Sequence, residues 1–302
     1  MHEGSKKAVI AALLGNAAIA LFKFSAAILS GSSSMLAEAY HSVSDSFNQV
    51  LLLYGIKRSK RPPDRLHPFG HGKEQFFWSF VVAIILFGIA GVLSVGEGLH
   101  KLRHPEPLAL LWLNYAAIAV AFFFESLALR IAVKSIKREM RREQHRTFIE
   151  AVRLSKNPIT MTVLFEDSLA LVGLCIAGAG ISVAHISGKP FFDAWASILI
   201  GVLLMVFALF LAAETKALLV GEAVTQRNRA RILNCLESFP EVEKVISLKT
   251  MHLGPEEVLV AVEIDYRDDL NLECLESLND KIEEMIREVV PDAKVYLEPE
   301  RM

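Results

Sequence analysis

The sequence is poor in cysteine and lacks several patterns that mark common classes of protein. Its three cysteines, Cys175, Cys235 and Cys274, are scattered along 302 residues, so they predict neither a disulfide framework nor a thiolate metal knuckle. Basic residues form no stripe of the kind that nucleic-acid binding requires, and we expect no nucleic-acid partner. The C-terminal part also lacks a nucleophile motif and a glycine-rich phosphate loop. The sequence therefore does not indicate an enzyme.

What the sequence does have is apolar residues, which make up 53% of the chain and give a mean hydropathy of +0.38. Soluble domains are typically about 45–50% apolar. The charges divide unevenly: the chain from Lys216 onward has 19 acidic and 11 basic residues, whereas the part before it has 15 and 21. This division predicts a membrane domain over residues 1–215 and a water-facing domain over residues 216–302.

Apolar stretches long enough to cross a bilayer, which takes about 20 residues, recur six times. They cover approximately residues 8–28, 34–56, 75–99, 108–133, 159–184 and 192–213. The second is the least apolar, because it contains Glu38, His41, Asp45 and Asn48. An even number of spans places both termini on the same side of the membrane.

Basic residues in the connections indicate which side that is. They crowd the connections after the second and fourth spans: Lys57, Arg58, Lys60, Arg61, Arg65 and Lys73 in the first, and Lys134, Lys137, Arg138, Arg141, Arg142, Arg146, Arg153 and Lys156 in the second. Basic loops face the cytoplasm. We therefore expect an integral protein of the cell (inner) membrane, with the lipid bilayer around it and both termini in the cytoplasm.

The C-terminal domain reads as helix, strand, strand, helix, strand. The amphipathic patterns predict helices over residues 227–239 and 272–289 and strands over residues 242–249, 258–264 and 294–297. Such an order indicates a small ferredoxin-like α+β domain, with helices on one face of a mainly antiparallel sheet. We expect a regulatory or dimerising role for it.

Ionisable residues inside a span are costly and usually functional. His41 and Asp45 are four residues apart and so share a helix face, and Asn48 follows on the same face. Glu166 and Asp167 lie in the fifth span. Imidazole and carboxylate groups from two helices could form a site for a divalent ion such as zinc. The alternative is structural: His41 and Asp45 pair with each other or with Lys23.

Other polar residues allow more than one interpretation. Asp64, His67 and His71, in the connection after the second span, could form a second metal site or an ordinary surface loop. We expect Asp193 to cap the start of the sixth span. Glu97 and Glu125 could be helix-packing polar groups or part of a proton path.

Two segments resemble the cation diffusion facilitator family. The family's second-helix signature resembles the run from Lys23 to Asn48, which contains Ser30-Gly-Ser-Ser-Ser-Met-Leu-Ala-Glu-Ala-Tyr-His41-Ser-Val-Ser-Asp45. Arg61-Pro-Pro-Asp64-Arg-Leu-His67-Pro-Phe-Gly-His71-Gly-Lys-Glu resembles its loop into the third helix. The resemblance covers essentially the whole chain. It implies a homodimer that exports zinc or a similar ion in exchange for protons (H⁺).

The resemblance also assigns residues to the transport site. His41 and Asp45 match the family's pair on the second helix, and Asp167 matches one member of the pair on the fifth. The other member falls at Val163, which cannot bind metal, so Glu166, Asn48 or water would supply the fourth ligand in this divergent branch. Such a donor set would also accept Mn²⁺, Fe²⁺ or Co²⁺.

The remaining sites follow from the same resemblance. Asp64, His67 and His71 match the family's second metal site position by position. In the tail, Ile246, Val262 and Tyr296 occupy positions that are often histidine in the family, so we expect no binuclear zinc site there. His252 is the only histidine of the tail.

The hypothesis is transport by alternating access, in which protons from outside displace the metal. A membrane-embedded sensor or assembly partner that binds metal without moving it is the alternative. A channel fits less well, because a compact ligand set favours tight binding over rapid conduction.

Overall fold

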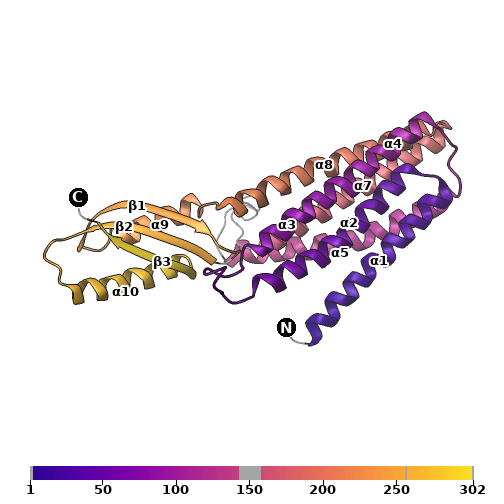
Figure 1. Cartoon of the computed structure of the whole chain (residues 1–302). Helices are drawn as coiled ribbons and strands as arrows, with labels where there is room; N and C mark the ends of the chain where they lie inside the picture. Colours follow the sequence, from indigo (N-terminus) through magenta and orange to yellow (C-terminus); the bar gives the residue numbers. More distant parts are fainter. Residues whose placement is uncertain (1–2, 143–157, 256, 301–302) are drawn as a thin grey trace. The chain divides into compact units, whose positions relative to one another are not determined.

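The computed structural model describes residues 3–142, 158–255 and 257–300 (Figure 1). Its contacts divide the chain into two compact units. The first unit comprises Met1–Leu51 and Val81–Ala212. The second comprises Leu52–Phe80 and Ala213–Met302. The second unit thus groups the connection after the second span, and the helix ends that flank it, with the C-terminal domain.

Long helices form the membrane part, at the six predicted places. Their bounds are α1 Glu3–Ser30, α2 Ser33–Ser59, α3 Glu74–Ile85, α4 Leu93–Arg103, α5 Leu111–Arg142, α7 Pro158–Ser187 and α8 Phe191–Val220. A π-helical segment, η1 (Leu86–Val92), joins α3 to α4 in one continuous span. Arg146, Arg153 and Lys156 of the second basic connection lie outside the described residues.

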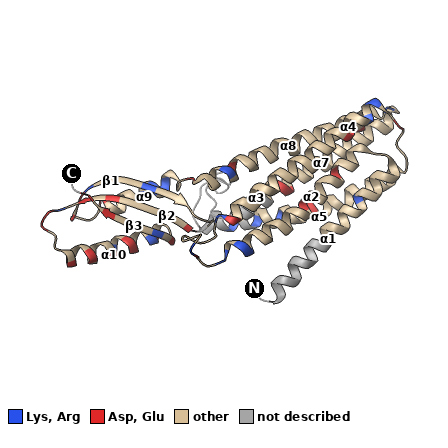
Figure 2. Cartoon of the chain, viewed as in Figure 1, with Lys and Arg blue, Asp and Glu red and all other residues tan. Residues whose placement is uncertain are grey.

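Four helical stretches are long and apolar enough to cross a membrane by length and composition: Glu74–Arg103, Leu111–Arg138, Leu164–Ser187 and Phe191–Val220. In α1 the described apolar stretch, Gly15–Ser30, is shorter. The polar residues of α2 lower its hydropathy, as the sequence indicated. Figure 2 shows long uncharged stretches on the membrane helices, whereas acidic residues recur along the tail helix α10 (Leu272–Val289).

Glycines allow η1 and α4 to pack closely against α8. A Cβ added at Gly201 would lie 2.7 Å from the carbonyl oxygen of Gly91, and one added at Gly98 would lie 2.7 Å from that of Ala194. The Ser197 hydroxyl donates a hydrogen bond to the Ser94 carbonyl oxygen at 2.8 Å. Small residues and interhelical hydrogen bonds of this kind stabilise helix pairs in membranes.

Asp193 has a different role from the one expected. It lies in the first turn of α8 and is fully buried. Its carboxylate accepts hydrogen bonds from the Ser33 backbone N–H at 2.7 Å, the Ser34 backbone N–H at 3.3 Å, and the hydroxyl groups of Ser32, Ser33 and Ser34. Asp193 therefore caps the start of α2. The expectation that it caps its own helix was wrong, because α8 already begins at Phe191 and the Asp193 carboxylate accepts from the free N–H groups at the start of α2 instead.

The tail has the predicted order of elements: α9 (Gln226–Leu236), β1 (Val242–His252), β2 (Glu257–Tyr266), α10 and β3 (Asp292–Pro299). The strand order is β1-β2-β3. β1 pairs with β2 antiparallel, and β2 pairs with β3 parallel. The expectation of a mainly antiparallel sheet was wrong at this second pairing, because α10 forms the crossover between β2 and β3 and returns the chain in the same direction.

The tail core confirms that both helices cover one face of the sheet. Alternate residues of β2 are buried against α9 and α10. The core consists of Val258, Val260, Val262 and Ile264 from β2, Ile232 and Leu236 from α9, and Leu278, Ile282 and Ile286 from α10.

Candidate metal sites

The α2 residues singled out in the sequence lie together on one buried helix face. His41 is 2% exposed and Asn48 is 3% exposed. His41 Nδ1 lies 3.4 Å from Asp45 Oδ1, one helical turn away. This face therefore presents an imidazole, a carboxylate and an amide in a row.

Helix α7 brings Glu166 to the same place. The Asn48 side-chain amide donates a hydrogen bond to Glu166 Oε1 at 3.0 Å. The carboxyl groups of Asp45 and Glu166 interact electrostatically. A proton or a cation between them would relieve the interaction, because two bare carboxylates repel each other.

Several ligand atoms of this site have no hydrogen-bond partner although they are buried. In the part of the chain that the structure describes, these are both ring nitrogens of His41, Oδ1 of Asp45, Oδ1 of Asn48 and Oδ2 of Asp167. Buried polar atoms are nearly always paired. Acceptor atoms left unpaired on four side chains from two helices are what a cation-binding site requires.

Glu125 adds a carboxylate from a third helix, α5. It interacts electrostatically with Asp167 and Asp45. Four carboxyl groups of the membrane part, those of Asp45, Glu125, Glu166 and Asp167, thus interact electrostatically. The sequence showed Glu125 inside a span but gave no sign of its neighbours, since those depend on how α5 packs against α7.

Lys23 does not neutralise the ligand residues directly. Its ammonium Nζ lies 3.0 Å from Glu38 Oε2 and donates a hydrogen bond to Ser42 Oγ at 2.8 Å. The structural alternative, in which His41 and Asp45 pair with Lys23, is therefore not what the structure contains. The other part of the alternative, in which His41 and Asp45 pair with each other, is compatible with the 3.4 Å distance between His41 Nδ1 and Asp45 Oδ1.

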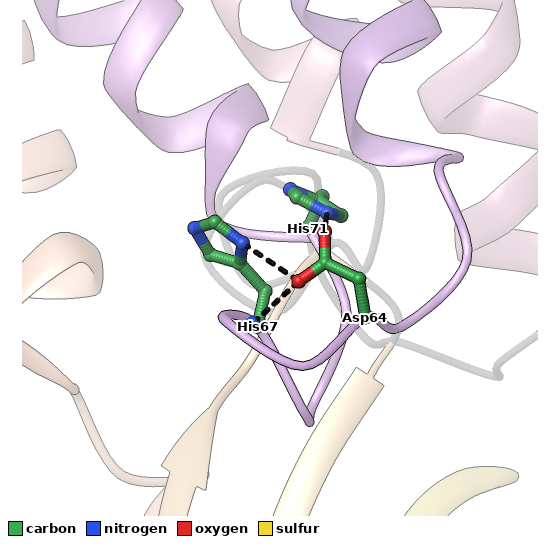
Figure 3. A group of neighbouring side chains, drawn as sticks. All are labelled: Asp64, His67 and His71. Atoms are coloured by element: carbon green, nitrogen blue, oxygen red, sulfur yellow. Dashed lines mark hydrogen bonds and ion pairs between the residues drawn. The ribbon is translucent and has the colours of Figure 1, made fainter.

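Asp64, His67 and His71 converge in the second unit (Figure 3). Asp64 Oδ1 lies 3.2 Å from His67 Nδ1, and Asp64 Oδ2 lies 3.1 Å from His71 Nε2. One ligand atom from each of the three residues lies within 4.8 Å of the others. This geometry fits a single metal ion held by two imidazoles and a carboxylate.

Backbone N–H groups of the loop stabilise the charged form of the Asp64 carboxylate, which is the form that binds metal. The backbone N–H groups of His67 and Leu66 donate hydrogen bonds to Asp64 Oδ1 at 2.7 and 2.9 Å. These hydrogen bonds, above all the one from the His67 backbone N–H, lower the pKa of Asp64 to about 2. A carboxylate with a depressed pKa loses its charge only as the pH falls toward that value, so proton competition near neutral pH falls on the imidazoles.

Contacts within the second unit fix the position of the loop. Its tight packing on the β1–β2 hairpin requires Gly72, since a Cβ added there would lie 2.5 Å from the carbonyl oxygen of Leu253. The Lys294 ammonium donates a hydrogen bond to the Phe69 carbonyl oxygen at 2.8 Å. The loop that carries His71 is therefore held directly against the tail.

The tail positions that are often histidine in the family have other roles. Val262 lies in the tail core at 1% exposure. Tyr296 packs edge-to-face against Phe69 at 6.3 Å between ring centroids. Ile246 and His252 both lie on β1. Val163 belongs to α7, but its side chain lies outside the described part of the chain.

The fold and these sites define a membrane-embedded protein with grouped candidate metal-ligand residues in its membrane part and in a loop. The description "cation efflux transmembrane domain" matches residues 9–220, and "cation efflux protein, cytoplasmic domain" matches residues 224–301. The chain therefore belongs to the cation diffusion facilitator family of cation efflux proteins, which confirms the resemblance found in its motifs.

Individual relatives extend this comparison. The chain is 34% identical over 266 residues to the proton-coupled zinc antiporter SLC30A9, mitochondrial, of Homo sapiens, covering 87% of this chain and 46% of that protein. It is 31% identical over 266 residues to metal tolerance protein C4 of Arabidopsis thaliana, covering 88% and 58%. The chain thus spans about half the length of these two relatives. It is 25% identical over 291 residues to the cation-efflux pump FieF of Klebsiella pneumoniae, covering 96% and 91%.

Proposed function

We propose that this protein exports a divalent transition metal in exchange for protons, with His41, Asp45, Asp167 and Glu166 as ligands of the transported ion. The observation that carries the proposal is the set of buried, unpaired ligand atoms on α2 and α7. Asn48, which positions Glu166, supplies a further oxygen. The name of the human relative, a proton-coupled zinc antiporter, supports the same activity.

Zinc is the proposed principal substrate, because one imidazole with carboxylates suits a borderline ion. Mn²⁺, Fe²⁺ and Co²⁺ are the competitors for this oxygen-rich set. Ligands must lose their protons to bind metal, so metal loading releases protons and proton entry favours metal release. Alternating exposure of the site to the two sides of the membrane turns this competition into exchange.

The remaining features of the proposal concern assembly and placement. The protein acts as a homodimer in the cell (inner) membrane, with both termini in the cytoplasm. The positive charge of the loops supports this orientation. The match of residues 224–301 to the family's cytoplasmic domain supports placing the tail in the cytoplasm, with the membrane domain ending near residue 215.

The test is metal uptake by proteoliposomes with an acidic lumen, comparing Zn²⁺, Mn²⁺, Fe²⁺ and Co²⁺. We expect uptake that depends on the pH gradient and is greatest for Zn²⁺. Metal binding in calorimetry without gradient-driven uptake of any ion would instead identify a sensor or assembly partner. Uptake that continues at an undiminished rate after the gradient has collapsed would indicate a channel.

The loop residues are proposed to hold a second, non-transported metal ion. We expect Asp64→Ala to reduce the number of zinc ions bound per chain by one in calorimetry, because two imidazoles alone bind zinc weakly. Leu66→Ala is the matched control, since this side chain in the same turn is 86% exposed and cannot bind metal. Unchanged stoichiometry in Asp64→Ala would show that the loop is an ordinary surface turn.

A further inference from the structure

Lys23 is a cation completely buried in the membrane part of the protein. Its relative exposure is 0%, as is that of its partner Glu38. The ammonium group contacts Glu38 Oε2 at 3.0 Å and Ser42 Oγ at 2.8 Å. An ion pair at this depth is costly to bury and is retained where it has a function.

This ion pair adjoins the metal ligands. Glu38 lies three residues before His41 on α2, and Ser42 directly follows His41. The Lys23 ammonium group interacts electrostatically with three titratable groups near the site: His41 and Asp45 on α2, and Glu125 on α5. The hydrogen bond to Ser42 therefore holds a fixed positive charge beside the ligand face of α2.

The other end of the ion pair is directed toward α7. Glu38 Oε1 is buried and has no hydrogen-bond partner among the described residues. It packs directly against Gly173, where any side chain would collide with this oxygen. The network thus spans α1, α2 and α7, and both helices that carry the proposed ligands contact it.

The charges of this network act on any cation bound nearby. A divalent ion bound by several carboxylates is held tightly, yet an exporter must also release it. A positive charge beside the site weakens binding, and a negative charge strengthens it. The two charges of the Lys23–Glu38 pair therefore have opposite effects on the same equilibrium.

We propose that Lys23 and Glu38 are positioning residues that set the metal affinity of the transport site by charge, Lys23 promoting release and Glu38 opposing it. This inference rests on the proposed function, because it takes the His41–Asp45 group as the transport site. Neither residue contacts the metal. Their effect passes through the local electric field and through the orientation of α2.

The test compares zinc affinity in Lys23→Gln, Glu38→Gln and the double variant, by calorimetry on detergent-purified full-length protein that carries Asp64→Ala to silence the loop site. Lys23→Gln is expected to lower the dissociation constant about tenfold, and Glu38→Gln to raise it about tenfold. The double variant should lie near the parent. In proteoliposomes, Lys23→Gln should lower both KM and the maximal rate, because release becomes slower.

Opposite shifts cannot come from damage to the fold, which weakens binding in either variant. If both single variants weaken binding, Lys23 and Glu38 have only a structural role and the inference is overturned. A second comparison applies if Lys23→Gln does not fold: Glu38→Gln should weaken binding, whereas Glu38→Asp, which retains the charge, should not. Equal effects of those two changes would also overturn it.

The outcome separates this inference from the proposed function. Opposite affinity shifts without any gradient-driven uptake in the parent protein would support the charge effect and refute the transport activity. Gradient-driven uptake without opposite shifts would support transport and refute the charge effect.

Discussion

Asp45→Asn is expected to reduce gradient-driven zinc uptake about 100-fold or more while the protein remains folded. Asp45 provides a buried oxygen, without a hydrogen-bond partner among the described residues, that lies 3.4 Å from His41 Nδ1, and its carboxyl group interacts electrostatically with Glu166. Loss of even an outer-shell partner of a metal site typically costs about 10–100-fold in affinity or activity, and loss of a ligand costs more. Asparagine keeps the shape of the side chain and removes the charge, so the change tests the ligand role directly.

The measurement is initial uptake into proteoliposomes with an acidic lumen, together with gel filtration to verify folding. Ser46→Ala is the matched control on the same helix, because among the described residues the Ser46 hydroxyl donates to the backbone carbonyl oxygen of Ser42 alone, at 3.0 Å. It should transport at nearly the parental rate. Normal transport by Asp45→Asn would refute the proposed site.

Asp193→Ala is expected to destabilise the membrane part by about 3–5 kcal/mol. The change removes the acceptor for two backbone N–H groups and three hydroxyl groups at the start of α2. Each buried donor left without a partner costs about 1–3 kcal/mol, although the hydroxyls can turn to other acceptors. Asp193→Asn should cost less, since its one remaining oxygen can still accept.

Thermal unfolding in detergent measures this effect. For a protein of this size we expect the midpoint to fall by about 10 °C in Asp193→Ala. Glu106→Ala serves as the control, because Glu106 is 77% exposed and its ion pair with Lys101 is long, at 4.0 Å. A midpoint for Asp193→Ala within about 2 °C of the control would contradict the capping role.

The sequence predicted those features that depend on local spacing. His41 and Asp45 share a helix face because four residues make about one turn, and β2 alternates because side chains of a strand point to opposite faces. The motif carrying Asp64, His67 and His71 is likewise local, and its three residues do converge. Pattern and family resemblance were sufficient for these elements.

Features that depend on which helices are neighbours could not be predicted from the sequence. Asp193 lies 160 residues from Ser33, and nothing in either segment indicates that they meet. Glu125 was recognised as unusual, but its closeness to Asp167 follows only from the packing of α5 on α7. The ion-pair partner of Lys23 could not be predicted either, since α2 offers Glu38, His41 and Asp45.

The close approach at Gly72 also bears on how substitutions in this protein should be interpreted. At Gly88 and Gly96 an added Cβ would meet no atom within 4 Å among the described residues, their own helix backbone and chain neighbours aside, so alanine is sterically acceptable at both positions. At Gly72 the obstacle is the backbone of Leu253 and Gly254, which cannot turn aside as a side chain can. A natural variant that replaces Gly72 would therefore disturb a loop histidine and the tail hairpin together, even though the substituted residue binds nothing itself.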